Sequence, residues 1–381
     1  MPHRYSKAFD WWRRLDFAAL LLCLILTMAG LFFIYGAGRQ IGGNFAGYWL
    51  RQLLFTLLGT AVFIGLVAVD YRRLGKWSWI LYLLAGLALL YVLFFGRTIN
   101  QASRWIYYRG FTLQPAELAK PMAALFLAWL ASRPSFSLKR PLNLAVFGLA
   151  AAPLPLLIAV QPDLGTAMVF VGMAAAIAFV GGVSWRCLAI LSLIAALLLP
   201  VAYFSLLEEY QRDRLRTLVK PSQDISAAGW NAHQALLAVG SGGPFGKGYM
   251  RGTQHVLGYL PRTVAPTDFI FSVIGEETGF LGAGALVCAY IALLICCLRS
   301  AARAPDNFGA YICVGVAAMF FIHAYINIGM SVYMAPIVGL PLPFVSYGGS
   351  FMLNMLISLG LVQSVYVRRD TPPPKQWRNY N

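Results

Sequence analysis

One acidic stretch lies at the start of an apolar run, where charged side chains are costly. The segment "PTDFIFSVIGEETGF" (266–280) carries three carboxylates, those of Asp268, Glu276 and Glu277. Its proline cannot continue a helix from upstream and Thr267 is a good N-cap, so we expect Asp268 in the first helical turn. An acid there is favoured by the helix dipole alone. At a membrane–water boundary the same carboxylate could act as a general base.

The two glutamates are expected to differ in role from Asp268. They would lie about 12–14 Å further along a helix and about 80° and 180° around its axis, so one face cannot present all three acids. Because acids within a membrane must face the bundle interior, we predict buried hydrogen-bonding roles for Glu276 and Glu277. Gly275 and Gly279 form a GxxxG pattern, which predicts close helix packing.

A second group of residues could bind an anionic substrate. In "QPAELAKP", Glu117 and Lys120 are three residues apart and share a helix face. They could neutralise each other as an ion pair, or Lys120 could bind a phosphate while Glu117 orients it. Upstream, "SRWIYYRG" offers Arg104 and Trp105, which could anchor the chain at the interface or hold a sugar face and a pyrophosphate.

Three further segments carry candidate residues. "QPDLGTA" places Asp163 in a tight connection, where a turn or an N-cap is the ordinary alternative to substrate binding. The glycine-rich run "GSGGPFGKGYMRG" adds the cations Lys247 and Arg251. "GLPLPFVSYGG" (339–349) includes Ser346 and is interrupted by Pro and Gly, so we expect it to close the same site from the other side. The histidines show no metal-ligand spacing, and we predict no metal site built from them.

Membrane helices must position these residues. The chain has 381 residues, 59% hydrophobic and 12% charged, and apolar runs near 20 residues recur along its length. We predict an all-α polytopic membrane protein, with no short alternating strands of the kind a membrane barrel needs. Ten spans are expected and nine is the main alternative; the ten are 15–37, 48–69, 77–96, 116–132, 142–160, 164–182, 186–205, 268–298, 309–335 and 349–367.

Basic residues predict the orientation. With the N-terminus inside, every short inner loop is basic, as the positive-inside rule requires. We therefore expect a cytoplasmic N-terminus (1–14), one membrane domain (15–367) and a cytoplasmic tail (368–381). A large extracytoplasmic loop (206–267) is expected to be structured and to contain a short amphipathic helix. The net charge of +16 suits anionic lipid headgroups or a phosphate-bearing substrate, whereas no nucleic-acid-binding module is found.

Several motifs, in order along nearly the whole chain, resemble the SEDS family of bacteria (shape, elongation, division and sporulation). They are "SRWIYYRGFTLQPAELAK", "QPDLGTA", "GWNAHQALLAVGSGGPFGKGYMRGTQ", "LPRTVAPTDFIFSVIGEETGFLGA" and "GLPLPFVSYGGS". "RGTQHVLGYLP" followed by "TDFIF" is more similar to the elongation branch of the family than to its division branch. The resemblance implies a ten-span peptidoglycan glycosyltransferase of the bacterial inner membrane that uses lipid II, with Asp268 as the catalytic residue. It also implies a class B penicillin-binding protein and other proteins of the elongation complex as partners.

Glycosyl transfer from lipid II requires a base and cations, and the candidate residues supply both. The 4-hydroxyl of an acceptor sugar would attack the anomeric carbon of the donor while a carboxylate takes its proton, and polyprenyl pyrophosphate would leave. Arg104, Lys120, Lys247 and Arg251 are candidates to stabilise the leaving group. We expect no organic cofactor and leave a divalent cation, Mg²⁺ or Mn²⁺, as an open option. Two other functions stay open: a lipid II flippase, since transporters also have buried acids and broken helices, and a non-catalytic scaffold for a penicillin-binding protein.

Overall fold

The computed structural model describes residues 10–99, 102–108, 111–187 and 227–371, with the positions 189–190, 193–194, 196–197 and 212 in addition. Within them the chain is mostly helical, which confirms the predicted fold class. The described helices are η2 (Asp10–Arg14), α1 (Phe17–Ile41), η3 (Gly43–Gly47), α2 (Tyr48–Ala68), α3 (Tyr71–Phe95), α4 (Pro115–Ala131), α5 (Pro141–Ala151), α6 (Pro153–Val160), α7 (Leu164–Val180), α10 (Ala227–Ser241), α11 (Ile270–Ala302), α12 (Asn307–Ser331) and α13 (Gly349–Val367).

Helix starts follow simple chemistry. Four helices begin directly after an aspartate whose side chain accepts a hydrogen bond from an amide of the first turn, namely Asp16, Asp70, Asp163 and Asp306. Three others begin with proline in the first turn, where its missing N–H costs nothing. The proline at 153 divides the predicted span 142–160 into α5 and α6.

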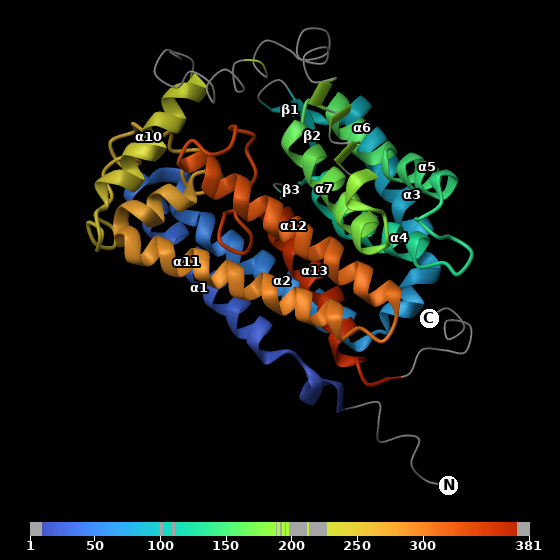
Figure 1. The fold of residues 1–381 in the computed structure, drawn as a ribbon. Coiled ribbons are helices and arrows are strands. Elements are labelled where there is room, and N and C mark those ends of the chain that lie inside the picture. Colours follow the sequence, from blue (N-terminus) through green and yellow to red (C-terminus); the bar gives the residue numbers. More distant parts are fainter. Residues whose placement is uncertain are drawn as a thin grey trace.

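A small antiparallel sheet lies between α3 and α4, where no strand was predicted from the sequence. Its strands are β1 (Arg97–Ile99), β2 (Ala102–Tyr108) and β3 (Phe111–Leu113), in the order β1-β2-β3. Trp105 is paired with Arg97 across β1, and Ile106 is paired with Leu113 across β3. The strands β1 and β2 lie at the end of the molecule where α10 also lies, opposite to the two termini (Figure 1).

The bundle is built around α12 and α13. α13 packs against α2, and α12 packs against α11 on one side and against α4 and α7 on the other. The two helices therefore lie between a group made of α1, α2 and α11 and a group made of α3 to α7 (Figure 1). In α13 the most apolar stretch is 94% buried, whereas in α2 the corresponding value is 22%, so α2 presents most of its surface outward.

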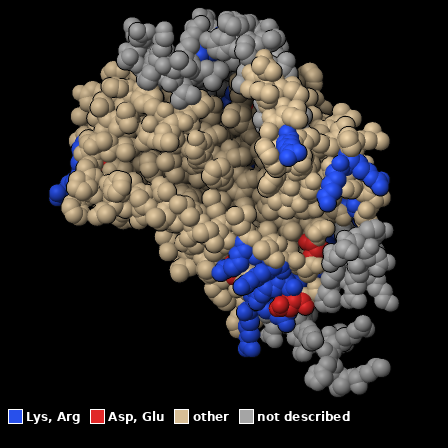
Figure 2. Space-filling view, in the orientation of Figure 1, with Lys and Arg blue, Asp and Glu red and all other residues tan. Residues whose placement is uncertain are grey.

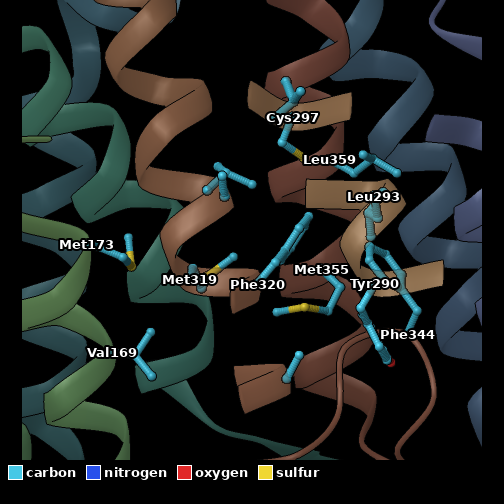
Figure 3. Packing of buried hydrophobic residues seen from close by; sticks show 14 of the residues in the cluster. Val169, Met173, Tyr290, Leu293, Cys297, Met319, Phe320, Phe344, Met355 and Leu359 are labelled. Carbon is cyan, nitrogen blue, oxygen red and sulfur yellow. The ribbon is translucent and has the colours of Figure 1, made fainter. Parts of the chain in front are cut away.

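The core joins α11, α12, α13 and the non-helical segment 332–348. Figure 3 shows Phe320, Met355 and Tyr290 packed near Phe344 of that segment. The rings of Phe320 and Phe344 are in edge-to-face contact at 5.4 Å, and the Tyr290 hydroxyl donates to the carbonyl oxygen of Pro343 at 2.6 Å. Residues 342–346 of this segment are thus buried in protein, which is the condition under which irregular backbone is tolerated at membrane depth.

Seven described helical segments are long and apolar enough to cross a membrane, namely 17–41, 45–68, 71–95, 141–160, 270–302, 307–331 and 349–367. The shorter helices α4 and α7 correspond to two more of the predicted spans. The predicted span 186–205 lies largely outside the described residues, as does the loop between 206 and 226 apart from residue 212.

Arginines gather at the end of the bundle that holds the start of α1 and the end of α13, and Figure 2 shows basic side chains grouped at the lower end of the view. Salt bridges link Arg299 to Asp16 at 2.6 Å and Arg72 to Asp306 at 2.7 Å. Arg369 donates to the carbonyl oxygen of residue 14. This end collects the residues that the positive-inside rule assigns to the cytoplasm.

Candidate functional site

Asp268 lies just before α11 and not in its first turn. The helix begins at Ile270 and no side chain caps it, so the predicted cap by Thr267 is wrong. The reason is a tight turn in which the carbonyl of Val264 accepts from the amides of Thr267, Asp268 and Phe269. The Thr267 hydroxyl donates back to the Val264 carbonyl and therefore does not accept from the helix. Asp268 is half-buried at this end of the bundle.

The segment 339–341 lies against Asp268, as predicted for the interrupted stretch. A Cβ added at Gly339, whose φ is +68°, would lie 3.2 Å from Oδ2 of Asp268. The side-chain amide of Asn327 donates to the carbonyl oxygens of Asp268 at 2.8 Å and of Leu340 at 2.7 Å. One α12 side chain thus holds the backbone of Asp268 and the backbone beside it.

Ser346, which lies shortly before α13, fixes the backbone on both sides of this contact, at Thr267 and at Leu342. It is fully buried; its Oγ donates to the carbonyl oxygen of Thr267 at 2.5 Å and accepts from the amide of Leu342 at 2.8 Å. The amide of the next residue, Tyr347, donates to the carbonyl oxygen of Pro266 at 2.9 Å. Ser346 therefore supports the turn that carries Asp268, and its substrate-binding role stays a prediction.

Glu117 and Lys120 form an ion pair in the bundle interior. Lys120 Nζ lies 2.6 Å from Oε1 of Glu117, and the exposed fractions of the two residues are 0% and 3%. Oε2 of Glu117 accepts from the side-chain amide of Asn354 at 3.0 Å. Nζ also lies 3.0 Å from Nε2 of His323. Both ends of the pair are thus satisfied by protein, as a buried charge pair requires.

Asp163 and Arg104 meet at the start of α7. Asp163 caps the helix, with Oδ1 accepting from the amide of Thr166 at 3.2 Å, and Oδ2 lies 3.6 Å from the Arg104 guanidinium. Arg104 also donates to the carbonyl oxygens of Gln161 and Pro162. The capping role of Asp163 is confirmed, and Arg104 anchors β2 to the α6–α7 connection. Trp105, the next residue, is half-buried.

Glu276 and Glu277 are buried and hydrogen-bonded, which confirms their predicted roles. Glu276 Oε1 accepts from Lys247 Nζ at 2.6 Å and from the amide of Thr253 at 2.8 Å. Glu277 Oε2 accepts from the amide of Met250 at 3.1 Å. Both acids thus point to the loop after α10, whereas Asp268 points to Gly339. Lys247 neutralises Glu276, so the structure does not bring it to Asp268.

Gly279 breaks α11 and does not form the helix–helix contact predicted from GxxxG. Its φ of +69° and ψ of −163° are accessible to almost no residue but glycine. The glycine-rich loop bridges the break with four backbone hydrogen bonds. The amides of Lys247 and Gly248 donate to the carbonyls of 276 and 277, and the amides of 280 and 281 donate to the carbonyls of 243 and 244. At Gly279 the predicted partner helix is therefore replaced by a loop, whereas Gly275 packs closely against Val239 of the helix α10, as predicted.

Arg251 and His255 also belong to the loop that follows α10. Arg251 is exposed, and its backbone amide donates to the carbonyl oxygen of Gly248 at 3.1 Å. His255 is fully buried, with Nε2 2.6 Å from Oε1 of Gln40, and burial lowers its pKa below the usual 6.5.

The predicted amphipathic helix of this loop is α10, whose Trp230 and Leu237 are exposed while Ala235 is buried.

Sequence reasoning missed three polar residues that connect these groups: His323, Asn327 and Asn354. Each has an exposed fraction of 0% and lies within an apolar span. A signal existed, because a polar side chain inside a membrane span almost always faces the bundle interior and contacts another polar group. What the sequence could not supply is which groups they contact.

The described bundle is that of a polytopic α-helical membrane protein whose half-buried carboxylate lies at the end of a span, beside an interrupted segment. A family model described as "Cell cycle protein", covering FtsW, RodA and SpoVE, matches residues 17–371. The chain therefore belongs to this family, as its motifs predicted. The peptidoglycan glycosyltransferase MrdB of Escherichia coli is 34% identical over 93% of this chain and 94% of its own. The expected enzyme class, a peptidoglycan glycosyltransferase, is confirmed.

Solved structures agree with this assignment. A chain from work on the structural coordination of polymerization and crosslinking by a peptidoglycan synthase complex has a TM-score of 0.80 and 30% identity, covering 94% of this chain and 99% of its own. The rod shape determining protein RodA of Thermus thermophilus has a TM-score of 0.70 and 28% identity, covering 94% of this chain and 98% of its own. The similarity extends over the whole bundle.

Proposed function

We propose that this chain joins lipid II units into glycan strands during cell elongation, with Asp268 as the general base. The observation that carries the proposal is the position of Asp268. Its carboxylate is half-buried at the end of a span, next to a glycine that has no side chain to obstruct approach. Its backbone is fixed by Asn327 and, through Thr267, by Ser346. A general base needs this combination of access and fixed geometry.

The proposed reaction is a single displacement. The 4-hydroxyl of the acceptor sugar attacks the anomeric carbon of the donor, its proton passes to Asp268, and the bond to the pyrophosphate breaks with inversion. General-base catalysis of this kind contributes about 10²–10⁴-fold. One substitution at the anomeric carbon needs one base, and no covalent sugar intermediate is required.

The leaving pyrophosphate needs cations, and the candidates differ in access. Arg251 is exposed and Arg104 is partly exposed, with 24% of its side chain accessible. Lys120 is fully buried against Glu117, and Lys247 is held by Glu276. We therefore propose Arg251 and Arg104 as the first contacts for the phosphates. Lys120 would reach a phosphate only if the substrate enters between α4 and α13.

A divalent cation would be held partly by the substrate. Among the described residues no three His, Cys, Asp or Glu side chains gather as a metal site. Asp268 could supply one oxygen ligand, and pyrophosphate oxygens and water could complete the shell, as Mg²⁺ commonly allows. A bound cation would neutralise charge on the leaving group, and no step of the proposed mechanism depends on it.

We also propose the inner membrane as the location, with the site on its extracytoplasmic face. The support is that the arginine-rich end lies opposite to α10, β1 and β2. A class B penicillin-binding protein is the proposed partner, together with other proteins of cell elongation. The similarity to a chain from a synthase complex that polymerises and crosslinks peptidoglycan supports a crosslinking partner.

The direct test is polymerisation of lipid II by the purified chain, with and without the partner. We expect Asp268→Asn to lose at least 100-fold in rate, because the amide cannot accept the proton. The matched control is Asp370→Asn, which makes the same chemical change at a residue whose side chain is 68% exposed at the arginine-rich end. Glycan chains of normal length and yield from folded Asp268→Asn protein would refute the proposal.

The two rival functions are tested in the same preparation. A flippase would exchange lipid II between leaflets of liposomes without polymerising it, and this exchange would survive Asp268→Asn. A scaffold would show no polymerisation by the isolated chain and none that depends on Asp268 in the complex. Polymerisation that requires Asp268 excludes a scaffold as the chain's sole role.

A further inference from the structure

We propose that His323 is a positioning residue for Asp268. Its ring, oriented by the buried Glu117–Lys120 pair, donates a hydrogen bond to the backbone segment that lies against the catalytic carboxylate. The inference rests on the proposed function of Asp268, and nothing in the sequence motifs or in the proposed mechanism assigns a role to this histidine. It is fully buried in the middle of α12.

The tautomer of His323 follows from its contacts. Lys120 Nζ lies 3.0 Å from Nε2 of the imidazole. An ammonium group has donors only, so Nε2 must accept and carry no proton. The remaining proton of the neutral ring is then on Nδ1, which lies 3.1 Å from the carbonyl oxygen of Pro341 and donates to it. Lys120, itself held by Glu117 at 2.6 Å, thereby orients the ring.

The donor from His323 acts on backbone that has little regular structure of its own. Gly339 has a φ of +68°, and the segment lies between the end of α12 and the start of α13. Buried carbonyls outside helices need donors from side chains. His323 supplies one to Pro341, and Asn327, four residues later on the same face of α12, supplies one to Leu340. The next residue back is Gly339, which lies against Asp268.

Two consecutive carbonyls, those of Pro341 and Leu340, are thus held, and the residue before them borders the carboxylate. If the donor to Pro341 is lost, the segment can move away from α12, and Gly339 moves with it. A displacement of about 1 Å near a reacting group can cost about 100-fold in rate. The expected effect is on the chemical step, because His323 is fully buried and acts through the backbone of the segment.

Three substitutions of His323 separate its two contacts. In His323→Asn, the amide nitrogen stands near the place of Nδ1 and can still donate to Pro341. In His323→Gln, the longer amide stands near the place of Nε2 and can still accept from Lys120. His323→Leu removes both contacts. We expect kcat to fall about 10–100-fold in the Gln and Leu variants, with KM for lipid II within twofold, and to recover most of this loss in the Asn variant.

The control is Ile312→Val, a small core change on the same helix at a residue that is fully buried. It should lower thermal stability slightly and leave kcat unchanged. A different ranking overturns the proposal: wild-type kcat in folded His323→Leu, or recovery by Gln and not by Asn. If Asp268→Asn stays active in the same assay, the proposed base itself fails and the positioning role fails with it. If Asp268→Asn is inactive, the His323 result tests positioning alone.

A second measurement needs no functional variant. Solid-state NMR of the ¹⁵N-histidine-labelled protein in lipid distinguishes the two imidazole tautomers, and His323→Gln identifies the resonance of His323 among the four histidines. A protonated Nδ1 and an unprotonated Nε2 support the proposal. A proton on Nε2 contradicts it, because Nδ1 could not then donate to Pro341.

Discussion

The hydroxyl of Ser346 donates a hydrogen bond of 2.5 Å to the carbonyl oxygen of Thr267, the residue directly before Asp268. The Oγ of Ser346 also accepts a hydrogen bond from the amide of Leu342. A single buried side chain therefore connects the turn that presents the carboxylate to the interrupted segment before α13. The geometry of the site depends on contacts between parts of the chain that are almost 80 residues apart in sequence, 267 and 346.

We expect Ser346→Ala to lower the free energy of unfolding by about 1–3 kcal/mol, because it leaves a buried carbonyl and a buried amide without partners. The rate of lipid II polymerisation should fall further than this loss explains. Ser364→Ala is the matched control, since Ser364 is also fully buried and its Oγ donates to the carbonyl of Val69 at 2.8 Å. Equal effects of both variants on polymerisation would argue against a special role for Ser346.

Gly279→Ala should destabilise the protein strongly. The glycine-only backbone conformation costs an alanine roughly 1–3 kcal/mol. In addition, its Cβ would lie 2.3 Å from the backbone nitrogen of Gly246, so the loop must move. Gly284→Ala, at a helical glycine of α11 with open space around it, should leave the unfolding temperature in detergent unchanged or slightly higher. Tolerance of both changes would show that the break in α11 is not fixed by the loop.

Lys247→Met should destabilise the loop, because Glu276 stays buried and loses its charged partner. Loss of a hydrogen bond to a charged group costs roughly 1.5–3 kcal/mol, and the remaining donors from Thr253 keep the effect within this range. Adding Glu276→Gln should restore part of the unfolding temperature. A double variant no more stable than Lys247→Met alone would contradict the pairing.

Stability should fall as the pH drops below about 6.5, and His255 should account for part of the loss. Burial lowers its pKa in the folded state, so below the unfolded value of about 6.5 the unfolded chain binds the proton more readily. The difference is absent at pH 8 and grows towards pH 5. Unfolding temperatures should be measured for the native protein and for His255→Gln across this range. Between pH 8 and pH 5 the unfolding temperature of the native protein should fall further than that of the variant. An unchanged pH slope in the variant would refute this assignment.

Lys120→Met alone would leave the Glu117 carboxylate buried without its cation, which costs about 3–5 kcal/mol. The combined change Lys120→Met with Glu117→Gln removes both charges and should fold. If Lys120 contacts the donor phosphate, as predicted from the sequence, this double variant should use lipid II poorly when it is limiting. Unchanged kinetics at limiting substrate would restrict Lys120 to its contacts within the bundle.

The sequence alone predicted the class of fold, most of the spans and the acids, because burial in a membrane leaves a strong compositional signal. Asp163 as a cap and Glu276 as a buried acceptor followed from local chemistry. The start of α11 did not, since the turn at Val264 and the bond from Ser346 override the local capping preference of Thr267. Gly279 was misassigned for a similar reason: its spacing from Gly275 fits helix packing, and only the fold shows the loop beside it.

The break in α11 has a consequence for how the protein is made. Phe280, directly after the break, is 77% exposed, and nearby Phe245 is 78% exposed, so apolar surroundings are expected around the interruption. Unsatisfied amides and carbonyls there would each cost several kcal/mol in hydrocarbon. A newly made span with an open break is therefore costly in lipid until the glycine-rich loop, which precedes it by some thirty residues, has folded back against it. Insertions between 242 and 248 should accordingly first be seen as degradation of the newly made chain.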